Sequence, residues 1–316
     1  MILLSNGRAL EYVVASGALA FDGKGWPWER ILVWLRLIRP ELFTIFTKSL
    51  TRQEVVGNLQ WWRPWRCVRP MLNDSWVNKV ALTNKGFDWW CNRVAPTIDF
   101  GKYQIAVSLF GKEEDLGYMA ERLNPFPLTA VEVNPFCPNA IHPMDTIEAV
   151  VKGAKEVKRV CRHPEVVKLS AAQDCVSISK ELEGTAEALS LNSVPWEMVF
   201  PGGRPSPLWR LQKKVGGGGG GVSGKLAQKH NWAVVKALVE QVKIPVIAPS
   251  ITEFKDLAYV RKELRAQAVS FGGVHLPSHP VWLKPWTIFT NPCKPTAFVR
   301  REKEKLAYSI PKLFVG

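Results

Sequence analysis

The chain has 316 residues, 47% of them hydrophobic, so it can bury a sizeable core and does not have the composition of a disordered protein. Its 42 Lys and Arg outnumber 28 Asp and Glu, and the resulting formal charge of +14 favours an anionic ligand or surface. Tryptophan is enriched as well, which is typical of base stacking or of a membrane interface. Nine of the 14 tryptophans lie near the N-terminus: Trp26, Trp28, Trp34, Trp61, Trp62, Trp65, Trp76, Trp89 and Trp90.

Three classes of protein are excluded by pattern. No stretch approaches the roughly 18 apolar residues of a spanning helix, because residues 31–46 are interrupted by Arg36, Arg39 and Glu41. The N-terminus has no basic segment leading into an apolar one, so secretion is not expected. The cysteines are spread singly without a C-x-x-C pair, which argues against a zinc ribbon, an iron–sulfur cluster and a disulfide scaffold. We expect reduced thiols in a cytoplasmic protein at Cys67, Cys91, Cys137, Cys161, Cys175 and Cys293.

Short β-branched runs alternate with longer amphipathic segments along the chain, a pattern that predicts β/α units on a parallel sheet. The predicted strands are 43–47, 77–82, 103–109, 128–134, 165–169, 187–192, 244–248 and 267–271. Helices are predicted over 113–123, 145–161, 231–242 and 253–264. Eight such units predict an α/β fold of the (β/α)8, or TIM-barrel, type.

We expect residues 1–316 to form a single barrel domain with two additions. Residues 1–42 are predicted to be an N-terminal extension, with a helix in the Trp26–Phe46 stretch covering the barrel floor rather than anchoring the protein to a membrane. Residues 195–224 are predicted to be a loop inserted over the C-terminal face. That loop contains the glycine run Gly216–Gly221. Because this run lies ahead of a helix, we interpret it as a segment that can approach a phosphate or a planar ring closely, and not as a linker.

Polar residues follow the predicted strands, where a (β/α)8 barrel forms its active face. Two lysines and three asparagines are among them, more than turn or capping preferences alone would place there. These strand ends carry Thr47, Lys48, Thr83, Asn84, Asn134, Lys168, Asn192, Ser193, Gly272 and Gly273.

The most informative segment is Val131–Asn139, in which Asn134 closes a strand and Cys137 lies on the following loop. A thiol in this position can act as a general base or nucleophile if positive charge lowers its pKa, and Lys48 and Lys168 can supply that charge. We interpret Cys137 as catalytic and the other five cysteines as inert.

At this point the sequence resembles the dihydroorotate dehydrogenase family, FMN-dependent barrels that oxidise dihydroorotate to orotate in pyrimidine biosynthesis. No single match is specific, but their order along nearly the whole chain is. The matching segments are 15–17, 47–51, 57–58, 78–86, 134–139, 167–170, 191–193 and 220–224. The cysteine at the base position resembles the soluble class 1 enzymes, whereas the membrane-bound class 2 enzymes carry serine.

The resemblance implies that Cys137 removes the C5 proton of dihydroorotate while a hydride leaves C6 for the flavin N5, with Lys48 between flavin and substrate. It implies substrate binding by Lys48, Asn78, Ala81, Leu82, Asn134, Asn139, Asn192 and Ser193. It implies FMN binding by Ala15, Ser16, Gly17, Lys48, Ser49, Asn134, Lys168, Gly220, Gly221, Ser250, Gly272 and Gly273, and it implies no metal.

The sequence departs from the family where a Gly-Gly pair would donate backbone N–H groups to the FMN phosphate. Pro249 and Ser250 occupy these positions, and proline has no N–H. We expect FMN binding to be weakened rather than abolished, because the hydroxyls of Ser250 and Thr252 could compensate.

Two other functions are compatible with the sequence. A tRNA-dihydrouridine synthase is also an FMN barrel with such a cysteine and would suit the charge, although the chain after Asn291 is too short for the usual RNA-binding domain. A non-catalytic scaffold that binds nucleic acid or a membrane surface is the second alternative. The dihydroorotate dehydrogenase reading implies a homodimer that uses fumarate, or a separate electron-transfer subunit for NAD, and it leaves the electron acceptor open.

Overall fold

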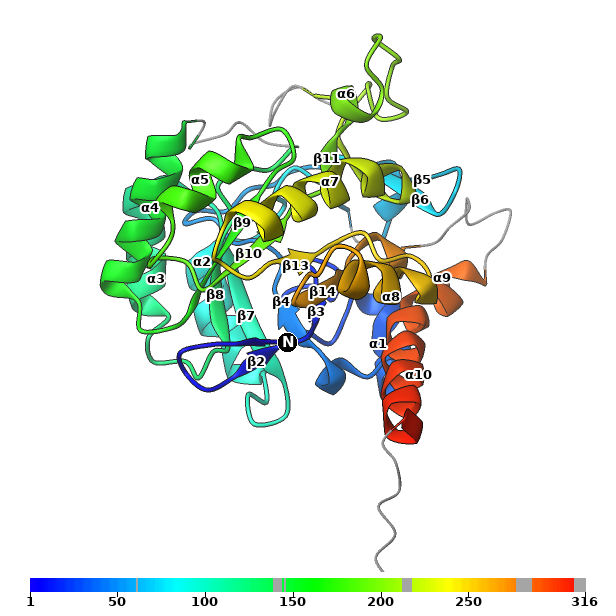
Figure 1. Ribbon diagram of the computed structural model, residues 1–316, viewed down its shortest axis with the longest axis horizontal. Helices are drawn as coiled ribbons and strands as arrows, with labels where there is room; N and C mark the ends of the chain where they lie inside the picture. The colour runs from blue at the N-terminus through cyan, green and yellow to red at the C-terminus, as the bar shows by residue number, and fades with distance from the viewer. Residues whose placement is uncertain (61, 139–143, 145, 212–217, 277–285, 310–316) are drawn as a thin grey trace, which may run out of the picture.

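The computed structural model describes residues 1–60, 62–138, 144, 146–211, 218–276 and 286–309 (Figure 1). Eight parallel strands in it form one sheet. They are β3 (Tyr12–Val14), β4 (Thr44–Phe46), β7 (Gln104–Leu109), β8 (Ala130–Val133), β9 (Glu165–Leu169), β10 (Ala188–Leu191), β13 (Ile247–Ala248) and β14 (Ala268–Phe271).

The sheet closes into a barrel. Its strand order is β10-β9-β8-β7-β4-β3-β14-β13, and a parallel bridge between Leu189 and Val246 joins the two outer strands. The predicted (β/α)8 barrel is therefore confirmed.

The sequence prediction misplaced one barrel strand. Residues 77–82 were expected in the barrel, but β6 (Ser75–Asn78) pairs antiparallel with β5 (Val68–Met71) and β12 (Gly221–Gly224). The missing barrel strand is β3, which pairs with β14 and β4 and lies inside the range expected to be an N-terminal extension. Both segments are short and mostly buried, so pattern alone could not tell which one joins the barrel.

Helices follow most of the barrel strands and cover its outside (Figure 1). Four lie at the predicted places: α3 (Glu113–Arg122), α4 (Ile147–Val160), α7 (Lys225–Gln241) and α8 (Phe254–Lys262). The others are α1 (Pro27–Trp34), α2 (Phe87–Trp89), α5 (Cys175–Glu181), α6 (Trp196–Val199), α9 (Thr287–Thr290) and α10 (Lys294–Ser309). The start of α4 is fixed by Thr146, whose side chain accepts the backbone N–H of Ala149 at 3.2 Å. None of the helices in the described parts of the chain is long and apolar enough to cross a membrane.

A four-stranded antiparallel sheet is built from two insertions. Its order is β11-β12-β6-β5, with β11 at Val194–Pro195. β5 and β6 follow the second barrel strand, and β11 and β12 follow the sixth. Both insertions therefore leave the barrel at the carboxyl ends of its strands, as expected for residues 195–224.

The barrel interior has an apolar layer below a polar one. Each strand contributes one buried apolar side chain to the lower layer: Val13, Phe46, Ala106, Ala130, Val166, Ala188, Ile247 and Ala268. Ile2, Leu4 and Leu10, around the hairpin β1 (Ile2–Leu3) and β2 (Ala9–Leu10), belong to the same cluster.

On six of the eight strands, the side chain two residues further along returns to the interior on the carboxyl side, and there it is polar and buried. This upper layer consists of Lys48, Ser108, Glu132, Lys168, Ser190 and Ser270. It forms a polar floor beneath the barrel mouth.

Candidate functional site

A cavity of about 1160 Å³ opens above this polar floor. It brings together most of the residues that the sequence singled out, from strands and loops far apart in the chain. Those lining it are Ala15, Ser16, Gly17, Lys48, Ser49, Asn78, Ala81, Leu82, Asn134, Cys137, Lys168, Asn192, Ser193, Gly272 and Gly273.

Three predicted residues do not line the cavity, and a fourth cannot be placed. Gly221 lies behind Asn78, and its carbonyl accepts the Asn78 side-chain amide at 3.2 Å. Gly220 lies beside it, with its carbonyl bound to the backbone N–H of Trp196. Ser250 points away, toward Asn231, whose amide donates to the Ser250 hydroxyl at 3.2 Å. Asn139 lies outside the described residues, as do Trp61, Gly216 and Gly217.

A buried ion pair forms the centre of the polar floor. The Lys168 ammonium lies 3.2 Å from the Glu132 carboxylate, and the two side chains are 7% and 2% exposed. Ser190 donates to the other carboxylate oxygen of Glu132 at 3.0 Å. Because a buried charge is tolerated only when it is paired and hydrogen-bonded, Glu132 keeps Lys168 in place under the cavity. The sequence analysis missed Glu132 and Ser190, although the two-residue period of the strands could have located them.

Hydrogen bonds fix the two asparagines on either side of the Cys137 loop. Asn134 donates to Ser49 at 3.1 Å, and Asn192 donates to the Asn134 side-chain oxygen at 2.9 Å and to the carbonyl of Phe136. Ser49 also contacts the Ser108 hydroxyl at 2.9 Å. This network holds the amides rigidly enough to recognise the edge of a polar ring.

Cys137 is half-buried at the cavity wall and packs against the cluster of Leu82 and Phe110, as does Val55. Lys48 lies close enough for the two to interact electrostatically. Burial lowers the pKa of Lys48 to about 8, while negative charge on Cys137 and Cys67 opposes that lowering and Lys168 adds to it. The cavity therefore contains a sulfur and a buried cation that stabilise each other's charged forms.

The loop carrying Ala81 and Leu82 has an unusual backbone. Both residues have positive φ, +57° and +55°, in the left-handed region that non-glycine residues disfavour. Gly57 packs directly against this loop, because a Cβ there would lie 2.6 Å from the Ala81 carbonyl oxygen. This strained stretch of backbone lies at the edge of the cavity, next to the cluster of Leu82 and Phe110 against which Cys137 packs.

Tryptophans build the outer wall of the cavity. Trp26, Trp28, Trp62, Trp65 and Trp76 all line it. Trp26 and Trp28 stack at 6.0 Å with an interplanar angle of 12°. The Trp26 indole N–H donates to the carbonyl of Gly17 at 3.1 Å, which ties this wall to the loop after β3. The sequence analysis noted the tryptophan enrichment but did not assign these side chains to the site.

Helix α1 also lies differently from the prediction. Pro27, Trp28 and Glu29 line the cavity, so the helix does not cover the barrel floor. Glu29 faces His275, with 3.9 Å between a carboxylate oxygen and the ring Nδ1, and both side chains are 2% exposed. Burial raises the pKa of Glu29 to about 8 and lowers that of His275 to about 4, so both are uncharged near pH 7.

A closed parallel barrel with a cavity at the carboxyl ends of its strands is the arrangement of (β/α)8-barrel enzymes. The chain is similar to the catalytic subunit of dihydroorotate dehydrogenase B (NAD(+)) from Bacteroides thetaiotaomicron, at 31% identity over 189 residues, 57% of this chain and 60% of that one. The same subunit from Carboxydothermus hydrogenoformans is 25% identical over 225 residues, 69% of each chain. That from Bacteroides fragilis is 30% identical over 189 residues, 57% of this chain and 60% of that one.

The chain thus spans about 60% of the length of the first of these relatives. No protein-family model matches it. Two solved structures share parts of the fold. The Amycolatopsis orientalis BexX/CysO complex has a TM-score of 0.39 and 14% identity, covering 70% of this chain and 75% of that one. Dihydrodipicolinate synthase from Oceanobacillus iheyensis has a TM-score of 0.38 and 13% identity, covering 68% and 57%. Neither likeness is close enough to inform the function.

Proposed function

We propose that this protein is a flavin-dependent oxidoreductase that converts dihydroorotate to orotate, with Cys137 as the general base. The observation that carries the proposal is the convergence of Cys137, Lys48, Asn134 and Asn192 on one cavity at the barrel mouth. The resemblance of the chain to catalytic subunits of dihydroorotate dehydrogenase B supports it independently.

The inner part of the cavity suits the ring system of a flavin such as FMN. Its volume of about 1160 Å³ exceeds that of most single-ligand pockets and has room for two planar molecules side by side. Lys168, held by Glu132, offers a cation to a ring that gains negative charge on reduction. Ala15, Ser16 and Gly17 offer a small-residue surface along one side. A bound flavin would supply a hydride acceptor, which no amino-acid side chain can provide.

The side chains of the protein carry out the other steps, each with its own role. The C5 proton of dihydroorotate lies next to a carbonyl group, so a thiolate at Cys137 is basic enough to remove it. The buried Lys48 ammonium stabilises the thiolate before transfer. The Asn134 amide, oriented by Ser49 and Asn192, keeps a second N–H that would donate to the oxygen on which charge develops. The proton ends on sulfur, and the two electrons of the C6–H bond leave with the hydride.

The names of the relatives also indicate a partner subunit. They are catalytic subunits of an NAD(+)-linked enzyme, which implies a second subunit there. We propose the same division here: this chain oxidises the pyrimidine, and a separate electron-transfer subunit passes electrons to NAD. A homodimer that reduces fumarate directly is the alternative assembly.

The substitution Cys137→Ser tests the role of the sulfur. A serine hydroxyl is a much weaker base near neutral pH, so flavin reduction by dihydroorotate should slow by about 10² to 10⁴-fold. Stopped-flow absorbance under anaerobic conditions measures this step, and flavin affinity should stay the same.

Cys293→Ser is the matched control, because Cys293 is also half-buried but only donates to the carbonyl of Phe289 and does not line the cavity. The flavin bound to Cys293→Ser should be reduced by dihydroorotate at the wild-type rate. If Cys137→Ser were as fast as wild type, Cys137 would have no part in the mechanism.

A further inference from the structure

The loops after the seventh and eighth strands of a (β/α)8 barrel commonly bind a phosphate, together with the N-terminus of a nearby helix. Here the loop after the seventh strand, β13, runs from Pro249 to Glu253 and leads into α8. The loop after the eighth strand, β14, begins at Gly272 and Gly273. These are the places where the 5′-phosphate of FMN would be expected.

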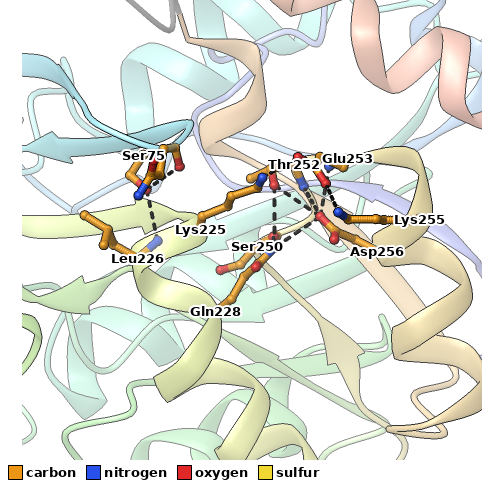
Figure 2. Close-up of polar contacts among 10 residues, drawn as sticks. Ser75, Lys225, Leu226, Gln228, Ser250, Thr252, Glu253, Lys255 and Asp256 are labelled. Carbon is orange, nitrogen blue, oxygen red and sulfur yellow. Dashed lines mark hydrogen bonds and ion pairs between the residues drawn. The ribbon is translucent and has the colours of Figure 1, made fainter.

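A carboxylate of the protein already occupies the N-terminus of α8 (Figure 2). One oxygen of Asp256 accepts the backbone N–H groups of Thr252 at 2.8 Å and of Glu253 at 2.9 Å. The same oxygen accepts the Thr252 hydroxyl and the Gln228 amide, both at 3.1 Å. Asp256 is 5% exposed. The backbone N–H groups of Thr252 and Glu253, which a phosphate at this helix end would use, are therefore already bound to an internal anion.

A second carboxylate lies at the same helix end. Glu253 precedes α8 and pairs with Lys225 and, at 2.8 Å, with Lys255 (Figure 2). The Lys225 ammonium that could attract a phosphate is thus engaged by a carboxylate. A phosphate dianion at the N-terminus of α8 would lie close to the carboxylates of both Glu253 and Asp256, and charges of the same sign repel each other at close range.

The rest of this loop is no better suited to an anion. Pro249 has no N–H, and its carbonyl accepts the Trp232 indole at 3.0 Å. The Ser250 hydroxyl is bound to Asn231, and the Thr252 hydroxyl is bound to Asp256. The Thr252 hydroxyl therefore already donates to a carboxylate of the protein, and the Ser250 hydroxyl is turned toward Asn231 and does not line the cavity.

The loop after β14 is partly covered by Trp76. A Cβ on Gly273 would lie 2.8 Å from the Trp76 ring, and a Cβ on Gly224 would also lie 2.8 Å from it. The indole, 1% exposed, therefore fills the space between these two glycines. An apolar ring in this position does not solvate a dianion.

We propose that this cavity binds a flavin through its ring system without a phosphate site at the N-terminus of α8, so that the chain does not favour FMN over riboflavin. The inference rests on the proposed function. Asp256 occupies the backbone donors at the N-terminus of α8, and the charge of Glu253 adds to the repulsion of a phosphate there.

The test is a comparison of the dissociation constants of FMN and riboflavin for the full-length protein, by quenching of flavin fluorescence. We expect the two values to agree within about threefold. A phosphate held by several charge-assisted hydrogen bonds would instead favour FMN by about 100-fold or more. A clear preference for FMN would overturn the inference and leave the proposed function intact. Failure to bind either flavin would overturn both.

Two variants locate the cause. Asp256→Asn keeps a side-chain oxygen to cap α8 but removes the charge, so FMN should gain roughly tenfold in affinity relative to riboflavin. Glu263→Gln makes the same change in net charge at the exposed C-terminal end of α8 and should leave the ratio unchanged. If Asp256→Asn did not shift the ratio more than Glu263→Gln, Asp256 would not be the excluding group.

Discussion

Lys48 is the residue whose charge the proposed reaction depends on most. Its side chain is buried in the polar layer of the barrel and lies near both Cys137 and Lys168. Burial lowers its pKa to about 8, far closer to neutrality than that of an ordinary lysine. The ammonium is therefore present near pH 7 but is lost a little above pH 8.

Flavin reduction should accordingly decline above about pH 8, as Lys48 loses the charge that stabilises the Cys137 thiolate. Lys48→Met removes the cation altogether and should slow the reaction by about 10²-fold at neutral pH. Stopped-flow reduction measured across this pH range provides the check. A wild-type profile that stayed flat to pH 10, or a Lys48→Met profile that kept the same alkaline decline, would show that another group titrates.

At the residue scale, the sequence located the reactive groups but not their supports. Cys137, Asn134 and Lys168 were found because each follows or ends a predicted strand. Glu132 was not, because the two-residue period of its strand places it inside the barrel but does not show which side chains of the neighbouring strands it meets. Its function depends on Lys168 and Ser190, which are brought to it only when neighbouring strands pair.

At the scale of elements, helix α1 and the turn after β14 meet at a buried pair of titratable groups. Glu29, on α1, faces His275, which follows the last barrel strand. Glu29 also accepts the backbone N–H of Trp26 at 2.9 Å and so caps its own helix. A charge on this carboxyl would have to be accommodated in the interior, which explains why burial raises its pKa to about 8.

The stability of the protein should therefore fall as the pH rises toward 8. The folded-state pKa of Glu29 exceeds its unfolded value, so its stabilising contribution is complete below about pH 4.5 and is lost as the pH passes 8. The pKa of His275 is lowered to about 4, so its effect on stability has the opposite sign. Stability rises with pH through His275, and only below its unfolded-state pKa of 6.5. Burial also raises the pKa of Glu165 well above its usual value, so Glu165 acts in the same direction as Glu29, and a Glu29 variant is needed to separate the two.

Glu29→Gln should weaken this decline and stabilise the protein at pH 8 by roughly 2 kcal/mol, because the amide keeps the bond to Trp26 and never ionises. Urea unfolding at several pH values measures the effect. Glu240→Gln, at an exposed position on α7, is the control. A Glu29→Gln variant with the same pH dependence as wild type would show that Glu29 is not the group responsible.

The elements show why part of the fold could not be predicted. α3, α4 and α8 have clear amphipathic periods and were located to within a few residues. β6 and β3 are both short and mostly buried, and what separates them is their partners. β6 pairs with β12, about 145 residues later, whereas β3 pairs with β14 near the other end of the chain. Such long-range pairings leave no local trace in the sequence.

At the scale of the whole molecule, the positive charge and the tryptophans have separate explanations. Glu132 neutralises Lys168 within the barrel, so the cavity accounts for little of the +14 charge. The tryptophans are more closely linked to the site, because five of them line the cavity. The insertion carrying β5 and β6 brings Trp62, Trp65 and Trp76 over the barrel mouth, and α1 brings Trp26 and Trp28. An aromatic wall of this kind suits planar ligands.

The most direct test of the proposed function is anaerobic mixing of the flavin-loaded protein with free dihydroorotate. The account predicts that the visible absorbance of the flavin bleaches and that orotate forms in an amount equal to the flavin reduced. A flavin that stays oxidised in the presence of dihydroorotate would contradict the account. Reduction of uridine to dihydrouridine in tRNA by the reduced flavin would instead favour the tRNA-modifying alternative.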